Sequence, residues 1–141
     1  MIFKIRKNHP KAKNPNYTLE GDAGLDLFSV EEKIIKPDEI LKIRTGIEIE
    51  LPPKTVGLIW DKSGVAGNLG IKTMGGVFDE NYRGEIIVIM TNLSKKPHKI
   101  EINDKIAQLL IQKIEHPKIE IVENLSDSNR GKGKMGSTGR R

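Results

Sequence analysis

The stretch ILKIRTGIEIEL, residues 40–51, alternates apolar and polar side chains, as a strand with one buried face requires. Similar alternation occurs in VGLIW (56–60) and EIIVIM (85–90), and a shorter run, IFKI, occupies residues 2–5. Gly, Pro, Asn and Asp separate these runs, and the spacing of an amphipathic helix is rare. Many short strands at close spacing are typical of an antiparallel sandwich or barrel. The sequence therefore predicts an all-β domain.

Two segments are less clear-cut. The apolar residues of KIAQLLIQKI (105–114) fit either a helix or a strand buried on both faces, and the short length and all-β surroundings favour a strand. A short helix is predicted around residues 62–69, with Ser63 as its cap, although Gly64 and Gly67 weaken that prediction.

Composition narrows the protein class. The chain has 141 residues, which suits one domain, and it contains no cysteine, which excludes disulfides and Cys-based zinc sites. It has no run of about 18 apolar residues and no apolar stretch near its start that would suit a signal peptide. We expect a soluble, cytoplasmic protein that does not bind membranes.

Charge divides the chain into two parts. The last twelve residues, RGKGKMGSTGRR (130–141), carry five basic side chains and no acidic one, whereas residues 1–129 carry 19 of each sign. So polar a segment cannot bury enough surface to order itself. We expect a folded domain over residues 1–129, with a linker at 124–129, and a flexible glycine-rich arm over 130–141.

The arm has the chemistry of a polyphosphate ligand site. Its glycines let backbone N–H groups approach an oxyanion, Ser137 and Thr138 add hydroxyl donors, and Arg130 can bind phosphate through two hydrogen bonds. A solvated basic terminus or a nonspecific nucleic-acid arm is the alternative interpretation.

The segment GGVFDENYRGEI (75–86) predicts a β-hairpin with a polar tip. Main-chain groups at the mouth of a hairpin can read a planar base, Asp79 could orient and deprotonate a water, and Tyr82 could lie against a sugar. The alternative is an ordinary turn in which Asp and Asn bind the local backbone.

Two further clusters carry charge. In DKSGVAG (61–67), Lys62, the Ser63 hydroxyl and the Gly64 backbone would suit a phosphate chain, although the spacing is not that of a P-loop. In AGLDL (23–27), Asp26 stands between apolar residues and needs a cation, an Arg or a hydrated metal as partner. An Asp bonded to a turn is the alternative.

Together these segments resemble the five ordered motifs of the trimeric deoxyuridine triphosphatase (dUTPase) family. The matching stretches are AGLDLFS (23–29), DKSGVAGNLGI (61–71), GGVFDENYRGEIIV (75–88), NDKIAQLLI (103–111) and RGKGKMGSTG (130–139). The resemblance implies a jelly-roll-like β-barrel of the β-clip type. It also implies a homotrimer with active sites at subunit junctions, and Mg²⁺-assisted hydrolysis of dUTP to dUMP and pyrophosphate.

The resemblance also implies residue roles. Asp79 matches the carboxylate that holds the attacking water, and Asp26 matches the one that supports the metal through water, Mg²⁺ being held mainly by the triphosphate. Tyr82 matches the ring beneath the deoxyribose. The remaining substrate-binding positions are Lys62, Ser63, Gly64, Gly76, Val77 and Gln108 in the body, and Arg130, Met135, Gly136, Ser137 and Thr138 in the arm.

Several residues depart from the family pattern. Met135 stands where a phenylalanine usually stacks on uracil, and Lys134 replaces a glycine. Asp61 replaces a proline before the second motif, and Asn68 stands where a Lys is common. Lys62 replaces the commoner Arg, so it keeps a point charge but loses the bidentate fork.

Two alternatives remain open at this point. A dCTP deaminase would share the fold, although the glycine-rich tail and the residues 62–66 favour the dUTPase branch. A regulatory or nucleic-acid-binding member is the other alternative, but the neutral body with few aromatic residues makes nucleic acid an unlikely partner.

Overall fold

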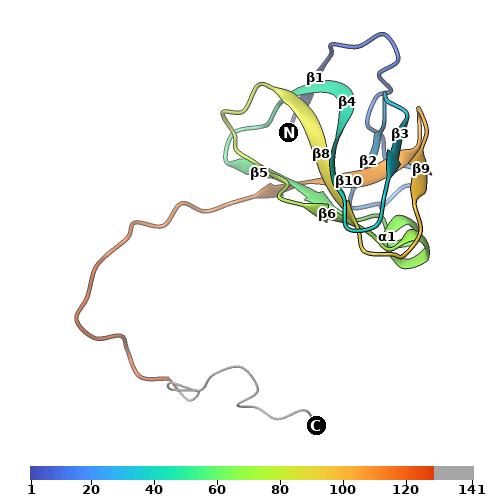
Figure 1. Cartoon of the computed structure of the whole chain (residues 1–141). Coiled ribbons are helices and arrows are strands. Elements are labelled where there is room, and N and C mark those ends of the chain that lie inside the picture. Colours follow the sequence, from blue (N-terminus) through green and yellow to red (C-terminus); the bar gives the residue numbers. More distant parts are fainter. Residues whose placement is uncertain (129–141) are drawn as a thin grey trace.

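The computed structural model describes residues 1–128, which form ten strands and one short helix (Figure 1). In chain order they are β1 (Lys4–Lys7), β2 (Leu25–Phe28), β3 (Lys33–Ile35), β4 (Ile40–Glu50), β5 (Thr55–Trp60), α1 (Ser63–Leu69), β6 (Ile71–Met74), β7 (Val77–Phe78), β8 (Glu85–Asn92), β9 (His98–Ile100) and β10 (Lys105–Lys113).

The strands form two four-stranded sheets, ordered β1-β4-β8-β6 and β2-β10-β5-β7, and a small β3-β9 pair. Every pairing is antiparallel. The all-β, jelly-roll-like prediction is therefore confirmed. The interior is aliphatic, because β8 turns every second side chain inward, and Ile86, Val88 and Met90 are fully buried.

Most predicted strands are present. The runs at 40–51, 56–60 and 85–90 correspond to β4, β5 and β8, and the ambiguous segment 105–114 is the strand β10. The N-terminal run lies two residues later than predicted. All four residues of β1 are exposed, so the pairing of β1 with β4, and not a buried face, determines its position.

The predicted hairpin over 75–86 is wrong in its pairing. β7 pairs with β5, whereas β8 pairs with β4 and β6, so the two strands on either side of Asp79 belong to different sheets. Gly75 and Gly76 have φ values of 63° and 91°, which only glycine adopts easily, and they turn the chain from one sheet into the other. A Cβ at Gly76 would lie 2.7 Å from the Ile59 Cβ.

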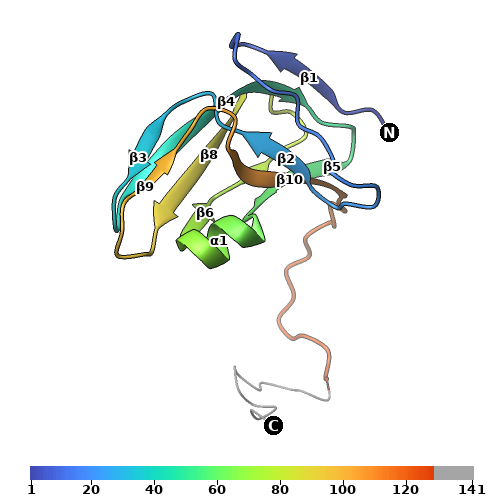
Figure 2. The ribbon, with the colours of Figure 1, turned by 90° about the vertical axis from the view of Figure 1, so that its right-hand side faces the viewer.

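The predicted short helix is confirmed, but its cap is not. Lys62 occupies the cap position, Ser63 is the first helical residue, and within residues 1–128 no side-chain hydrogen bond caps the helix. The Ser63 hydroxyl therefore forms no capping hydrogen bond with its own helix. Figure 2 shows α1 next to β6, at one end of the body.

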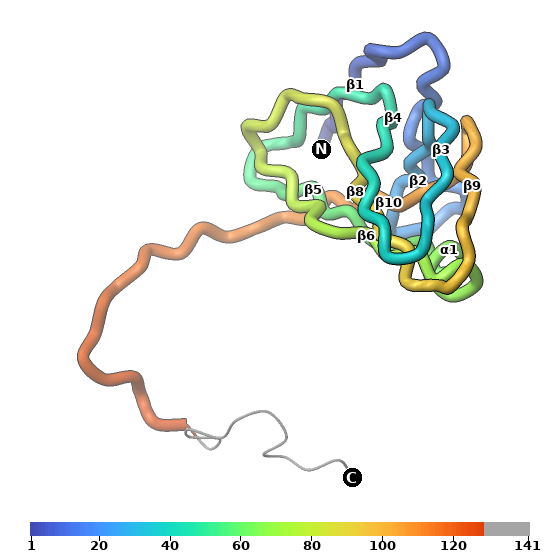
Figure 3. Tube along the Cα trace, viewed as in Figure 1, coloured from blue at the N-terminus to red at the C-terminus, as the bar shows by residue number. Residues whose placement is uncertain are grey.

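Beyond β10 the chain leaves the sheets. Ile114 still donates its N–H to the Lys54 carbonyl, at 3.1 Å, but residues 115–128 are neither helix nor strand and run away from the body (Figures 1 and 3). Among residues 1–128, no helix has the length and apolar character needed to cross a membrane.

Candidate active site

Asp26 lies on β2 and is the most buried charged group of the candidate site, with 3% of its surface exposed. One carboxylate oxygen binds Lys62 Nζ, and the other accepts bonds from Lys105 Nζ and Thr18 Oγ1, both at 2.7 Å. Lys105 also donates to Thr18 Oγ1, at 2.8 Å. We call Asp26, Lys62, Lys105 and Thr18 the Asp26 cluster.

The Asp26 cluster keeps its carboxylate ionised. Burial opposes ionisation, but hydrogen bonds from Lys105, Lys62 and Thr18 outweigh it and lower the pKa of Asp26 to about 2. Two lysines against one carboxylate leave a local excess of positive charge near the start of α1. Such a region suits an anionic ligand.

The phosphate-binding residues predicted in the second motif lie beside this cluster. Lys62 precedes α1 directly, and Ser63 and Gly64 form its exposed first turn. Gln108 joins them from β10, where it pairs with Trp60 and with Asp26. Its side-chain amide donates to the main-chain oxygen of Asp61 at 2.8 Å, so it also holds the loop that leads into the helix.

Asp79 lies elsewhere, in the exposed turn between β7 and β8. Its main-chain oxygen accepts the Tyr82 N–H at 3.0 Å, and the Arg83 guanidinium closes the turn on the carbonyls of Glu80 and Tyr82, both at 2.8 Å. Within residues 1–128 the Asp79 carboxylate accepts no hydrogen bond and forms no ion pair. It borders an open cavity of about 480 Å³, which is also lined by Val56 and His116.

Tyr82 is held rigidly in the same turn. Its hydroxyl donates to the Glu85 carbonyl at 2.8 Å, and its ring lies 5.2 Å from the ring of Phe78 at an interplanar angle of 56°. A Cβ at Gly84 would lie 2.5 Å from the Tyr82 hydroxyl, so only glycine permits this position. The ring therefore packs on the sheet, in an orientation held by Phe78 and by the Glu85 carbonyl.

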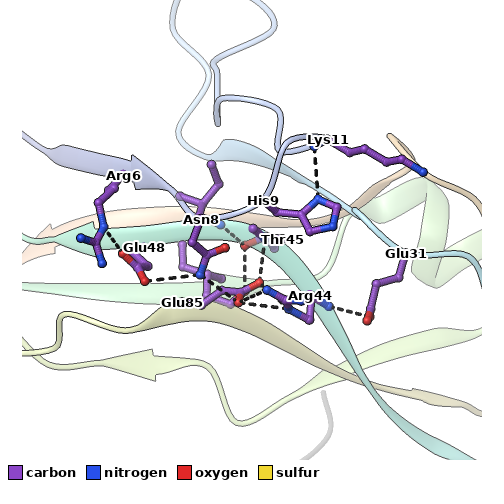
Figure 4. A network of polar contacts seen from close by, with 12 residues as sticks. Arg6, Asn8, His9, Lys11, Glu31, Arg44, Thr45, Glu48 and Glu85 are labelled. Atoms are coloured by element: carbon purple, nitrogen blue, oxygen red, sulfur yellow. Dashed lines mark hydrogen bonds and ion pairs between the residues drawn. The ribbon is translucent and has the colours of Figure 1, made fainter.

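A partly buried polar network anchors the turn where β8 begins (Figure 4). The Glu85 carboxylate accepts bonds from Arg44 (Nη2, 2.9 Å), from the Gly46 N–H (2.7 Å) and from Asn8 (3.2 Å). Gly46 has a φ of 67° and lies where the β4–β8 register shifts. Burial opposes ionisation of Glu85, but these donors hold its pKa below the usual value. The start of β8 is thereby fixed, and with it the Asp79 turn.

Gly76 and Val77, two of the predicted substrate-binding residues, border a smaller hollow of about 210 Å³ that also contacts Trp60 and Thr73. Gly76 accepts the Ile59 N–H at 2.8 Å, and Val77 is exposed. These two residues lie between the Asp79 turn and the Asp26 cluster, along one side of β5.

One chain does not bring all predicted residues together. Asp79 lies beside Val56 at the start of β5, whereas Lys62 and Gln108 lie at its end, beside Trp60. Val56 and Trp60 are four residues apart, which is about 13 Å along a strand. Asp79 and the residues predicted to bind phosphate therefore occupy opposite ends of the β5–β10 ladder. The arm residues Arg130, Met135, Gly136, Ser137 and Thr138 lie outside the described residues.

The described residues offer little to hold a metal by themselves. Within residues 1–128 no three His, Asp or Glu side chains gather as a metal site would require, and both Asp26 oxygens already accept protein hydrogen bonds. A divalent ion that arrives with a triphosphate fits this arrangement, because Mg²⁺ in such sites is held by substrate phosphates, waters and few carboxylates.

Sequence reasoning missed the partners of Asp26. Lys105 lies within the fourth motif, but no role was predicted for it, and Thr18 lies in an irregular loop. The buried Asp26 predicted that a cation must exist, but not which lysine supplies it. The position of Lys105 follows from the pairing of β10 with β2, in which Lys105 lies opposite Phe28.

Known proteins resemble this chain both in sequence and in fold. Among protein-family models, that of the dUTPase family matches residues 10–139. The deoxyuridine 5'-triphosphate nucleotidohydrolase of Clostridium kluyveri is 48% identical over 99% of both chains. That of Alkaliphilus metalliredigens is 46% identical over 97% of this chain and 96% of its own.

Solved structures agree in fold. A dUTPase variant from Staphylococcus bacteriophage 80alpha, solved with dUpNHpp, superposes with a TM-score of 0.90 at 27% identity over 98% of both chains. A dUTPase variant from phage phi11 of S. aureus, described with a structural Mg(II) ion, has a TM-score of 0.84 at 25% identity and covers 90% of this chain.

Proposed function

The chain belongs to the dUTPase family and is a dUTP diphosphatase, and we propose that each active site forms where the Asp79 turn of one subunit meets the Asp26 cluster of another. The observation that supports this proposal is the separation of these two groups by about 13 Å, at opposite ends of β5. Both groups are needed for the reaction. A second copy therefore has to supply the missing half.

In the proposed reaction Asp79 orients a water and accepts its proton as the water oxygen attacks the α-phosphorus. The bond from that phosphorus to the bridging oxygen breaks, and pyrophosphate leaves while dUMP remains. Within residues 1–128 the Asp79 carboxylate has no protein partner, so its lone pairs are open to a water. Catalysis of this kind depends mostly on positioning and on neutralising charge.

The triphosphate would lie against Lys62, Ser63 and the Gly64 backbone, with Gln108 near the phosphates. The Asp26 cluster supports this role, because the two lysines leave a net positive charge there. We propose Mg²⁺ as the cofactor, bound mainly by the triphosphate, with Asp26 acting through water. When bound, the ion neutralises phosphate charge and makes the pyrophosphate a better leaving group.

Tyr82 would discriminate at the sugar. Its ring is fixed by Phe78 and by the Glu85 carbonyl, so it cannot move aside for a 2′-hydroxyl. We expect efficient hydrolysis of dUTP and poor hydrolysis of UTP. Comparable rates for the two nucleotides would contradict this role.

Residues 115–128 support assembly into an oligomer. The apolar side chains of Ile119, Ile121 and Leu125 are 88%, 95% and 88% exposed. Such exposure is unfavourable for an isolated chain and suits a segment that packs on another subunit. The resemblance implies a homotrimer, with the arm residues Arg130, Met135, Gly136, Ser137 and Thr138 closing over the nucleotide. We also propose a cytoplasmic location, where deoxynucleotides are made and used.

The function is tested by measuring pyrophosphate release from dUTP, dCTP, dTTP and UTP, with and without Mg²⁺. We expect rapid release from dUTP only, and only with Mg²⁺. Ammonia release from dCTP would instead indicate a deaminase. The absence of turnover on every nucleotide would favour a regulatory protein.

The shared site is tested by mixing two inactive variants. Asp79→Asn lacks the water-holding carboxylate and Lys62→Ala lacks a phosphate contact, and either homotrimer should be nearly inactive. After co-refolding at equal amounts, random assembly pairs an intact Asp79 with an intact Lys62 in about a quarter of junction sites. Recovery of about that fraction of activity is expected, and no recovery would place both groups in one chain's site.

A further inference from the structure

Asp61 connects three parts of the candidate site, although no role was predicted for it. It lies between the end of β5 and the start of α1, and its side chain points to β6. One carboxylate oxygen accepts the N–H and the hydroxyl of Thr73, at 2.7 and 2.5 Å, and the other pairs with Lys72 Nζ at 2.8 Å.

The main chain of Asp61 is held as well. Its carbonyl accepts the Gln108 side-chain amide at 2.8 Å. Gln108 has little freedom, because a Cβ on Gly24 would lie 2.5 Å from its amide oxygen. Residue 61 is thus tied to β10 through its backbone and to β6 through its side chain. The next residue in the chain is Lys62.

We propose that Asp61 is a positioning residue, which sets the placement of the Lys62–Gly64 phosphate loop against β6 and β10. This inference rests on the proposed function, in which the Lys62–Gly64 loop binds phosphates. Asp61 stands where the resembling family usually has a proline. Here hydrogen bonds, in place of a ring, set the direction of the chain.

The bonds to Thr73 outweigh the ion pair with Lys72. Thr73 is 8% exposed, so its N–H and hydroxyl would lose their partner in a place that water reaches poorly. The Lys72 side chain is half exposed, and an ion pair with such a lysine contributes little. A neutral residue that still accepts from Thr73 should therefore replace Asp61 well, whereas a residue without an acceptor should not.

The test is a set of four variants assayed for dUTP hydrolysis, after wild-type pyrophosphate release has been established. Asp61→Ala should raise the KM for dUTP about tenfold and change kcat less than about threefold, because it displaces the loop and leaves Asp79 untouched. Asp61→Asn keeps the acceptor and should stay within about threefold of the wild-type KM. Lys72→Met, the matched control, should stay within about twofold.

The fourth variant, Asp61→Pro, separates backbone direction from side-chain bonding. If Asp61→Pro keeps the wild-type KM, the proline ring alone sets the direction of the chain, and the proposed role of the Asp61 side chain is overturned. A folded Asp61→Ala protein with an unchanged KM would also overturn the proposal, as would a loss of active protein at constant KM. If Asp61→Ala does not fold, Thr73→Val should still raise the KM about threefold. An unchanged KM in Thr73→Val would then overturn the proposal. An inactive wild type would refute the function itself.

Discussion

Two aspartates that we assign to the proposed active site, Asp26 and Asp79, have opposite surroundings. Asp26 is buried and accepts hydrogen bonds from two lysines and a threonine, whereas Asp79 is exposed and, within residues 1–128, has no side-chain partner. A carboxylate that already accepts three bonds has little capacity left to take a proton from water. One with free lone pairs has that capacity. Exposure to solvent and the number of hydrogen-bond partners, more than residue type, therefore distinguish a carboxylate that holds other side chains in place from one that can react.

Removing the reacting carboxylate should have the largest effect. Asp79→Asn keeps the size of the side chain and removes the base, so turnover should fall at least about 100-fold while nucleotide binding persists. Turnover from single-turnover assays and affinity from titration with a non-hydrolysable analogue measure the two separately. Glu32→Gln, an exposed carboxylate distant from the turn, is the control. Near-normal turnover in the Asn variant would remove Asp79 from its role.

Neutralising the organising carboxylate should act on stability. Asp26→Asn leaves Lys62 and Lys105 close together without a counter-charge, and the free energy of unfolding should fall by roughly 2 kcal/mol in urea titrations at pH 7. Glu20 is exposed, so Glu20→Gln should leave the free energy of unfolding unchanged and serves as the control. An equally stable Asn variant would show that the Asp26 cluster contributes no net stabilisation.

The stability that Asp26 contributes should depend on pH. The pKa of Asp26 is lowered to about 2 in the folded protein, below the value of about 4 of an unfolded chain. Its stabilising contribution is therefore complete above about pH 5 and is lost as the pH falls through about 2. The stability difference between wild type and Asp26→Asn should shrink over that range, and a difference that stays constant down to pH 2 would contradict the shift.

Deleting residues 130–141 tests whether the arm must close over the nucleotide bound between Asp79 and the Asp26 cluster. A chain ending at Asn129 should form the same oligomer but lose at least about tenfold in turnover, because water would reach the phosphates. A shorter deletion of Arg140 and Arg141 alone removes charge but keeps the residues assigned to the nucleotide, and should stay active. Full activity in the longer deletion would make the arm a solvated basic terminus.

The smallest expected effect concerns the base. Met135→Phe adds an aromatic ring where uracil is proposed to lie, and it should tighten binding of a dUTP analogue by about 0.5–1.5 kcal/mol. Calorimetry measures this difference, and Met135→Leu, which adds no ring, is the control. Equal affinity for both variants would mean that residue 135 does not contact the base.

The sequence alone determined the fold class, because alternation in 40–51 and 85–90 requires strands with one buried face. It also determined the candidate residues, since motif order is a property of the chain. The pairing of β7 with β5 was decided by tertiary structure, because Gly75 and Gly76 turn the chain into another sheet and periodicity carries no information on which strand becomes a neighbour. So was the choice of Lys105 as a partner of Asp26. The separation of Asp79 from Lys62 was likewise invisible in sequence, because distance along a ladder depends on register and not on motif order.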